Sequence, residues 1–213
     1  AIDGRIVNAG AKLYRKFNSK HLEPLAGEAV GEDGVCLLVR TSQSNIHFAQ
    51  AARTQAFLDG RPVDLLRRTI KDPGYIGHEL EIDVKQGQTL VLEKLASFYT
   101  SRDHAISECG LAAREAIGRA GQFDVVMADH VLAWKHLWHR FDVHIRPADP
   151  GFKLNVSMLL RLNMFHLLQA VSPNSIGLDH GVPARGWTGE AYQGHVFWDE
   201  LFIFPFFNHR MPE

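Results

Sequence analysis

The chain is 213 residues long, and its 46% hydrophobic and 22% charged residues give it the composition of an ordinary globular protein. Its 23 Lys and Arg residues nearly balance 24 Asp and Glu residues, and the net charge of −1 argues against the broad positive field that holds nucleic acids or anionic membranes. The longest apolar stretch, residues 201–207, contains Pro205 and is far shorter than the ~20 residues of a membrane span. We therefore expect neither a nucleic-acid nor a membrane partner.

The chain contains two cysteines, Cys36 and Cys109. Two are too few for a disulfide scaffold, and their separation is not that of a metal site, so we expect a reducing, cytoplasmic location. No signal peptide is recognisable. The first residue is not Met, and the last ones follow an apolar segment. From these features we expect both ends to be cuts in a longer protein.

The first hundred residues follow the period of two that is typical of β-strands. Residues 76–84 carry apolar side chains on one face and mainly acidic ones on the other. A turn at Lys85–Gln88 predicts a hairpin with a second strand over Thr89–Tyr99. Earlier strands are predicted at Arg5–Ala9, Val35–Thr41 and Ile46–Phe57, with a turn at Asp59–Gly60.

After residue 101 the apolar period changes to that of a helix. Asp103 is the expected N-cap of a helix that continues through Ala120. Further helices are predicted over Asp124–Arg140 and Lys153–Ala170, the latter with an apolar stripe formed by Leu154, Met158, Leu162 and Phe165, and a short β-like piece is predicted over Asp142–Arg146. Strands first and helices afterwards, without βαβ alternation, predict a two-part α+β fold.

A glycine-rich segment, residues 172–207, carries many aromatic and ionisable side chains. A connecting loop seldom needs such groups, whereas a loop that lines a polar pocket does. Trp198 and Asp199 are its sharpest pair, because an aromatic plane packs against the C–H face of a sugar while a carboxylate accepts hydrogen bonds from its hydroxyls. The structural alternative makes Trp198 a core residue and Asp199 an acid favoured by the dipole of a helix start.

A metal site is a further alternative for this segment. His195 and Asp199 are four residues apart, which would place two ligands on one face of a helix, with His180 or Asp179 as a third. No zinc motif is completed, so we predict no metal. Four histidines between residues 130 and 144 are spread around a helix and beyond its end, which favours solvated or capping roles. The chain also lacks a phosphate-binding glycine fingerprint and a Gly-x-Ser-x-Gly motif.

One stretch of the chain resembles a known family. It reads Gly189-Glu190-Ala191-Tyr192-Gln193-Gly194-His195-Val196-Phe197-Trp198-Asp199 and is followed by an apolar run that ends at Pro205-Phe206-Phe207. It is similar to the start of the catalytic barrel in glycoside hydrolase family 65, which includes inverting phosphorylases of maltose, trehalose, kojibiose and nigerose and also acid trehalases. Tyr14–Leu25 resembles a late part of that family's N-terminal β-sandwich, and Asp103–Arg140 resembles its linker helices. Gln193 and Glu200 depart from the Arg and Thr that many members have.

The resemblance implies a chain in three parts. Residues 1–100 would be the end of an antiparallel β-sandwich, residues 101–150 a helical linker, and residues 151–213 the first helices of an (α/α)6 barrel. It also implies that Trp198 and Asp199 hold the glucosyl unit on the donor side of the scissile bond. We assign His195 and Arg185, from the same segment, to the substrate site as well.

The resemblance further implies a reaction. An inverting glycosidase needs a general acid and a base that activates water, and a phosphorylase uses phosphate in place of that base and water. The expected substrates are an α-glucosyl disaccharide and inorganic phosphate as co-substrate, with no cofactor, and the parent enzyme is expected to be a homo-dimer. The family's acid is a Glu well downstream of the Trp-Asp pair, so we expect no catalytic residue in this chain and no turnover by it alone. A trehalase-type hydrolase and a non-catalytic carbohydrate-binding fragment are the alternatives.

Overall fold

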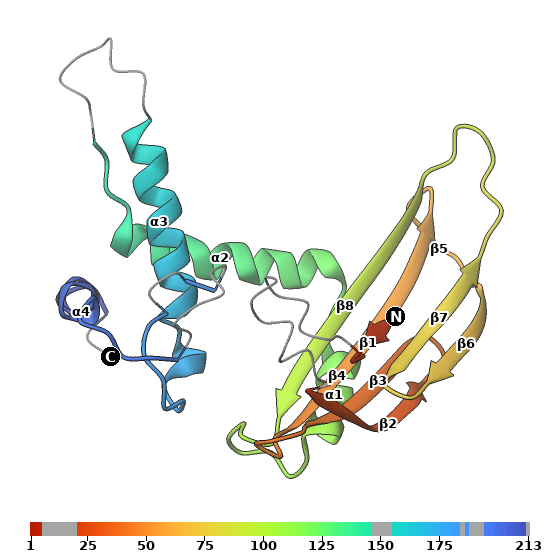
Figure 1. Ribbon diagram of the computed structural model, residues 1–213. Coiled ribbons are helices and arrows are strands. Elements are labelled where there is room, and N and C mark those ends of the chain that lie inside the picture. The colour runs from red at the N-terminus through yellow and green to blue at the C-terminus, as the bar shows by residue number, and fades with distance from the viewer. Residues whose placement is uncertain (6–20, 146–154, 184–185, 188–193, 212–213) are drawn as a thin grey trace, which may run out of the picture. The chain divides into compact units, whose positions relative to one another are not determined.

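The computed structural model describes residues 1–5, 21–145, 155–183, 186–187 and 194–211. The chain divides into two compact units, Ala1–Ala128 and Asp129–Glu213, which are treated separately below (Figure 1). The elements in chain order are β1 (Ile2–Asp3), β2 (Leu22–Val30), β3 (Gly34–Thr41), β4 (His47–Leu58), β5 (Arg61–Pro62), β6 (Leu66–Asp72), β7 (Tyr75–Glu81), β8 (Leu90–Thr100), α1 (Cys109–Arg119), α2 (Phe123–Phe141), α3 (Val156–Ala170), the 3-10 turn η2 (Pro173–Ser175) and α4 (Glu200–Asn208). The strands precede the helices, as predicted.

The first unit contains two antiparallel sheets. A five-stranded sheet has the order β2-β3-β4-β5, with β8 also paired to β4, and a three-stranded sheet has the order β1-β7-β6. The predicted strands over Val35–Thr41 and Ile46–Phe57 correspond to β3 and β4. Strands β2 and β6 were not expected. Both are edge strands, and edge strands carry polar residues and proline that weaken the alternation.

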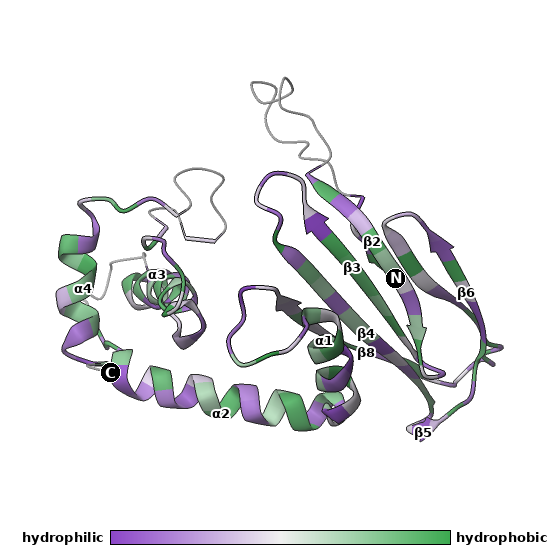
Figure 2. Ribbon diagram, turned by 90° about the horizontal axis from the view of Figure 1, so that it is seen from below, coloured by the Kyte–Doolittle hydropathy of each residue, from purple (hydrophilic) through white to green (hydrophobic). Residues whose placement is uncertain are grey.

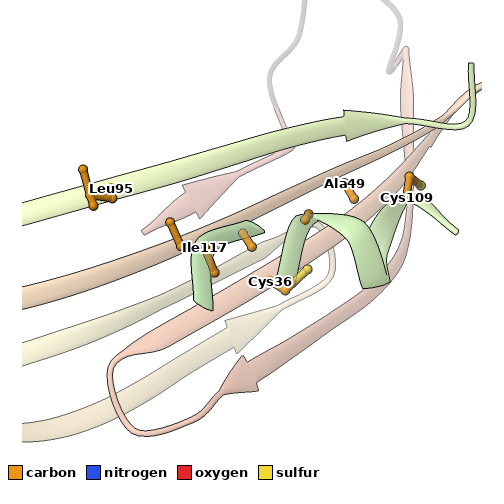
Figure 3. Close-up of a cluster of buried hydrophobic side chains, with 7 residues drawn as sticks. Cys36, Ala49, Leu95, Cys109 and Ile117 are labelled. Carbon is orange, nitrogen blue, oxygen red and sulfur yellow. The ribbon is translucent and has the colours of Figure 1, made fainter. Parts of the chain in front are cut away.

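Both faces of the five-stranded sheet are covered. On one face, Val35, Leu37 and Val39 of β3 pack against Ile2 and Ile76 of the smaller sheet. The opposite face packs against α1 through a second cluster made of Cys36, Ala49, Ala51, Leu95, Cys109, Ala113 and Ile117 (Figure 3). A strand that is buried on both sides is apolar at nearly every position, which explains the continuous apolar sequence of β3.

The predicted hairpin between residues 76–84 and Thr89–Tyr99 is wrong. Both strands exist, as β7 and β8, but β7 pairs with β1 and β6, whereas β8 pairs with β4 along its whole length. Alternation of apolar and polar side chains defines which face of a strand is buried and does not identify its neighbour. The two strands therefore belong to different sheets although they follow each other in the sequence.

Helix α1 begins at Cys109, five residues later than a helix capped by Asp103 would begin. Its N-cap is Glu108, whose carboxylate accepts hydrogen bonds from the backbone N–H groups of Gly110 and Leu111. Asp103 instead accepts the N–H of Thr100 at 2.6 Å and closes the turn that follows β8. Ala105 has a φ of +58°, and this left-handed conformation is incompatible with a continuous helix from residue 103.

The second unit is helical, and its core lies where α2, α3 and α4 meet. Phe141, Met164, Leu168 and Phe207 are its buried residues, and the rings of Phe141 and Phe207 lie 5.1 Å apart. Helix α2 agrees with the helix predicted over Asp124–Arg140. Residues 142–145 form no strand, in contrast to the predicted β-like piece, whose last residue lies outside the described part.

The predicted apolar stripe of α3 is not the side that the helix buries. Met158 and Leu162 are exposed, and the helix buries Met164 and Leu168 instead; Leu154 lies outside the described residues. Helix α3 thus carries apolar residues on both its exposed and its buried sides, and α4 is also largely hydrophobic (Figure 2). When a helix is apolar all round, its periodicity cannot indicate which side faces the core. Among the described helices, none combines the length and hydrophobicity needed to cross a membrane.

Candidate functional site

The candidate site is the turn that leads into α4. Asp199 occupies the N-cap position, and its backbone carbonyl accepts the N–H groups of Phe202 at 3.0 Å and Ile203 at 3.2 Å. Its side chain does not cap the helix, because its backbone already has helical φ and ψ angles. A half-buried carboxylate at a helix N-terminus that is not used for capping can accept hydrogen bonds from a ligand. The geometry therefore permits the role that the sequence predicts for Asp199.

Trp198 lies outside the buried core of the described residues. Its side chain is 68% exposed, and the described aromatic ring that it contacts is that of Phe202, edge to face at 5.8 Å. An exposed indole can serve as a stacking surface. Exposure and a neighbouring carboxylate are the two properties that the sugar-binding hypothesis requires of this pair.

His195 lies outside α4, which begins at Glu200. A metal site formed by His195 and Asp199 would need both residues on one face of a helix, and His195 precedes the helix. His195 is exposed, and its ring lies 5.9 Å from that of Phe197. Within the described ranges, no three His, Cys, Asp or Glu side chains are placed to hold a metal ion.

The glycine-rich segment before α4 is attached to the end of α3. The indole N–H of Trp187 donates to the carbonyl of Gln169 at 2.9 Å. The ring of His180 lies edge to face against Trp187 at 6.1 Å, and its Nδ1 is 3.0 Å from the carbonyl oxygen of Gly181. Arg185, the fourth predicted site residue, lies outside the described residues, as do residues 188–193.

Glu200 is a residue whose role the sequence did not reveal. Among the described residues, Glu200 is the buried charged residue, with 7% of its surface exposed. Its carboxylate accepts a hydrogen bond from the backbone N–H of Val182 at 2.8 Å. The sequence showed Glu200 only as a departure from a family pattern. Its position at the start of the apolar run Leu201–Phe207 was the available signal, because an acid placed among buried apolar residues needs a specific partner.

Comparison with known proteins decides the family. The family model described as "Glycosyl hydrolase family 65, N-terminal domain" matches residues 1–137. A second model, "Glycosyl hydrolase family 65 central catalytic domain", matches residues 161–213 and includes both Trp198 and Asp199. The chain belongs to glycosyl hydrolase family 65. The resemblance seen in the sequence is thereby confirmed, and the antiparallel sheets of the first unit are consistent with the N-terminal domain of that family.

Several curated relatives of this family 65 chain are longer proteins. An uncharacterised glycosyl hydrolase of Mycobacterium tuberculosis is 40% identical over 212 residues, which is 100% of this chain and 16% of that protein. The kojibiose phosphorylase of Caldanaerobacter subterraneus is 28% identical over 100% of this chain and 27% of its own length. The trehalose 6-phosphate phosphorylase of Lactococcus lactis is 28% identical over 99% of this chain and 26% of its own length. The chain thus spans about a quarter or less of these relatives.

Proposed function

We propose that the natural protein containing this chain catalyses the reversible, inverting phosphorolysis of an α-glucosyl disaccharide to β-glucose 1-phosphate and a sugar. Relatives at 28% identity along essentially the whole chain are phosphorylases of kojibiose and of trehalose 6-phosphate. We further propose that α3 and α4 are the first helices of an (α/α)6 barrel, that the three-part division at residues 100 and 150 holds, and that the enzyme is a cytoplasmic homo-dimer.

The observation that carries this proposal is the Trp198–Asp199 pair. The indole is exposed, and the adjacent carboxylate does not cap α4. A glucosyl unit offers an apolar C–H face that would lie against the indole and hydroxyl groups that would donate to the carboxylate. We propose that these two residues bind the glucosyl unit on the donor side of the scissile bond, and that His195 and Arg185 complete the same subsite.

In this proposal the chain binds the sugar and does not transfer the proton. Phosphate is already anionic, so it can attack the anomeric carbon without a base that activates water. The leaving oxygen needs a general acid, and Glu200 is unsuited because it is buried and its Oε1 is held by the N–H of Val182. We assign the general acid to a part of the protein outside this chain and expect no turnover by residues 1–213 alone.

Hydrolysis is the second candidate, because the mycobacterial relative at 40% identity is described as a glycosyl hydrolase. The natural full-length protein should be incubated with kojibiose, maltose and trehalose, with and without inorganic phosphate. Phosphorolysis requires phosphate and yields glucose 1-phosphate, whose β-anomer is identified by NMR. Release of free glucose at the same rate without phosphate would instead establish a trehalase-type hydrolase.

The substitution Asp199→Asn tests the site itself. Loss of the charged acceptor should lower kcat/KM for the disaccharide by about 100-fold, since a hydrogen bond to a charged group contributes ~1.5–3 kcal/mol. Asp129→Asn is the matched control, because Asp129 is an exposed acid in the middle of α2, and it should leave kcat/KM unchanged. An Asp199→Asn enzyme with wild-type kcat/KM would remove Asp199 from the substrate site.

A further inference from the structure

Glu200 is a buried carboxylate in the first turn of α4, next to the Trp198–Asp199 pair. Burying a charged group is costly unless specific partners compensate for the lost water. Two features of the structure supply that compensation. The carboxylate lies at the N-terminus of a helix, where the dipole favours negative charge. The backbone N–H of Val182, itself buried, donates to Oε1 of Glu200 at 2.8 Å.

The Glu200–Val182 hydrogen bond joins segments that are 18 residues apart. A second bond joins the same two segments, because the N–H of Gly181 donates to the carbonyl oxygen of Gly194 at 3.3 Å. Residues 181–183 are buried. The segment that follows α3 is therefore attached to the segment that enters α4 at two points, one on each side of the Trp198–Asp199 pair in the sequence.

Gly181 shows how close this contact is. A Cβ atom at this position would lie 2.3 Å from the carbonyl oxygen of His195 and 2.5 Å from Oε1 of Glu200. Real Cβ atoms do not approach other atoms so closely, so only glycine lets the backbone pass here. The backbone at Gly181 therefore has no space for a side chain, and the N–H of the next residue, Val182, donates to the carboxylate of Glu200.

We propose that Glu200 is a positioning residue for the sugar subsite. By holding the N–H of Val182, its carboxylate fixes the first turn of α4 against residues 181–183, and it thereby fixes the orientation of Trp198 and Asp199, which immediately precede it. Glu200 does not contact the sugar in this arrangement. The hydrogen bond is the operative feature, and the negative charge alone is not sufficient. The effect on activity rests on the proposed function of the Trp198–Asp199 pair.

Two conservative variants separate the hydrogen bond from the charge. Glu200→Gln keeps an oxygen at the same reach and loses the charge, whereas Glu200→Asp keeps the charge and withdraws the oxygens by one methylene group. In the natural full-length protein, we expect Glu200→Asp to lower kcat/KM for the disaccharide by about 10-fold to 100-fold, mainly through a higher KM. Glu200→Gln should stay within about 3-fold of wild type. The same two changes at the exposed Glu115 of α1 are the matched controls and should have no effect.

Hydrogen exchange provides a readout that does not depend on activity. The peptides that contain Val182 and residues 197–202 should both lose protection in Glu200→Asp and keep it in Glu200→Gln. Wild-type kinetics and exchange in Glu200→Asp, or equal losses in both variants, would overturn the positioning role. If the wild-type protein acts on no α-glucosyl disaccharide, the proposed function fails, and the exchange of the two peptides still decides whether Glu200 holds them together.

Discussion

The two units of the chain bury their apolar residues in different ways. In the first unit, the five-stranded sheet is covered on one face by β1 and β7 and on the other by α1, so that β3 is buried on both sides. In the second unit, α3 and α4 share a small core around Phe141, while Leu162, Leu201 and Phe202 remain exposed. The larger sheet of the first unit thus packs on both of its faces, whereas α3 and α4 of the second unit bury one side and leave apolar residues of another side exposed.

The difference indicates where each unit's stability and function reside. A sheet with both faces covered is stabilised by the described residues themselves, through burial of apolar surface. Helices with exposed apolar sides are typical of elements that pack against further parts of a protein. The candidate sugar site lies in the second unit. Substitutions in the first unit should therefore act on stability, and those around α4 should act on binding and association.

The largest expected effect on stability is at Ile76, which is fully buried between the two sheets. Ile76→Ala should lower the free energy of unfolding by about 2–5 kcal/mol, because the substitution leaves a cavity in a packed core. Leu66 of β6 is 76% exposed, and Leu66→Ala is the matched control with an expected change below ~0.5 kcal/mol. Urea unfolding of the 213-residue chain measures both. Similar losses for the two variants would show that the sheets are not packed as described.

An intermediate effect is expected on association. Leu201 and Phe202 are exposed near the start of α4, and exposed apolar patches drive proteins together. The 213-residue chain should therefore form oligomers or aggregates in light scattering, and the double substitution Leu201→Gln with Phe202→Gln should reduce them. Leu66→Gln, which changes an equally exposed leucine in the first unit, should not. A monodisperse wild-type monomer would contradict the contrast between the units.

The smallest effect is expected at the N-cap of α1. The N–H groups of Gly110 and Leu111 hold the pKa of Glu108 below its usual 4.5, so the stabilisation is present above that value and is lost as the pH falls through the lower folded pKa. Glu108→Ala should cost about 1 kcal/mol at pH 7. The deficit should shrink below pH 4.5 in urea titrations at several pH values. Glu115→Ala, in the middle of the same helix, should show no comparable pH dependence, and a constant deficit for Glu108→Ala would rule out the charged cap.

The sequence offered a candidate site through residue type and family resemblance, but it did not predict the packing around that site. Trp198 and Asp199 were proposed because a sugar needs an aromatic plane and a carboxylate, and because the stretch around them resembles family 65; their role stays a prediction. The buried face of α3 could not be predicted, because apolar residues lie on more than one side of that helix. The partner of β8 could not be predicted either, because the alternation of apolar and polar residues shows which face of a strand is buried and not which strand pairs with it. Arg185 lies outside the described residues, and its role stays a prediction.

What the sequence determined by itself was local. The strand and helix periods, the apolar run of β3 and the family pattern around Trp198 are all readable within a few residues of one another. Only the tertiary structure decided which strands pair, which side of α3 is buried and why Gly181 and Glu200 occur together. The reason is physical. The hydrogen bond from Val182 to Glu200 joins residues 18 positions apart, and a contact between distant residues produces no periodic pattern in the sequence around either of them.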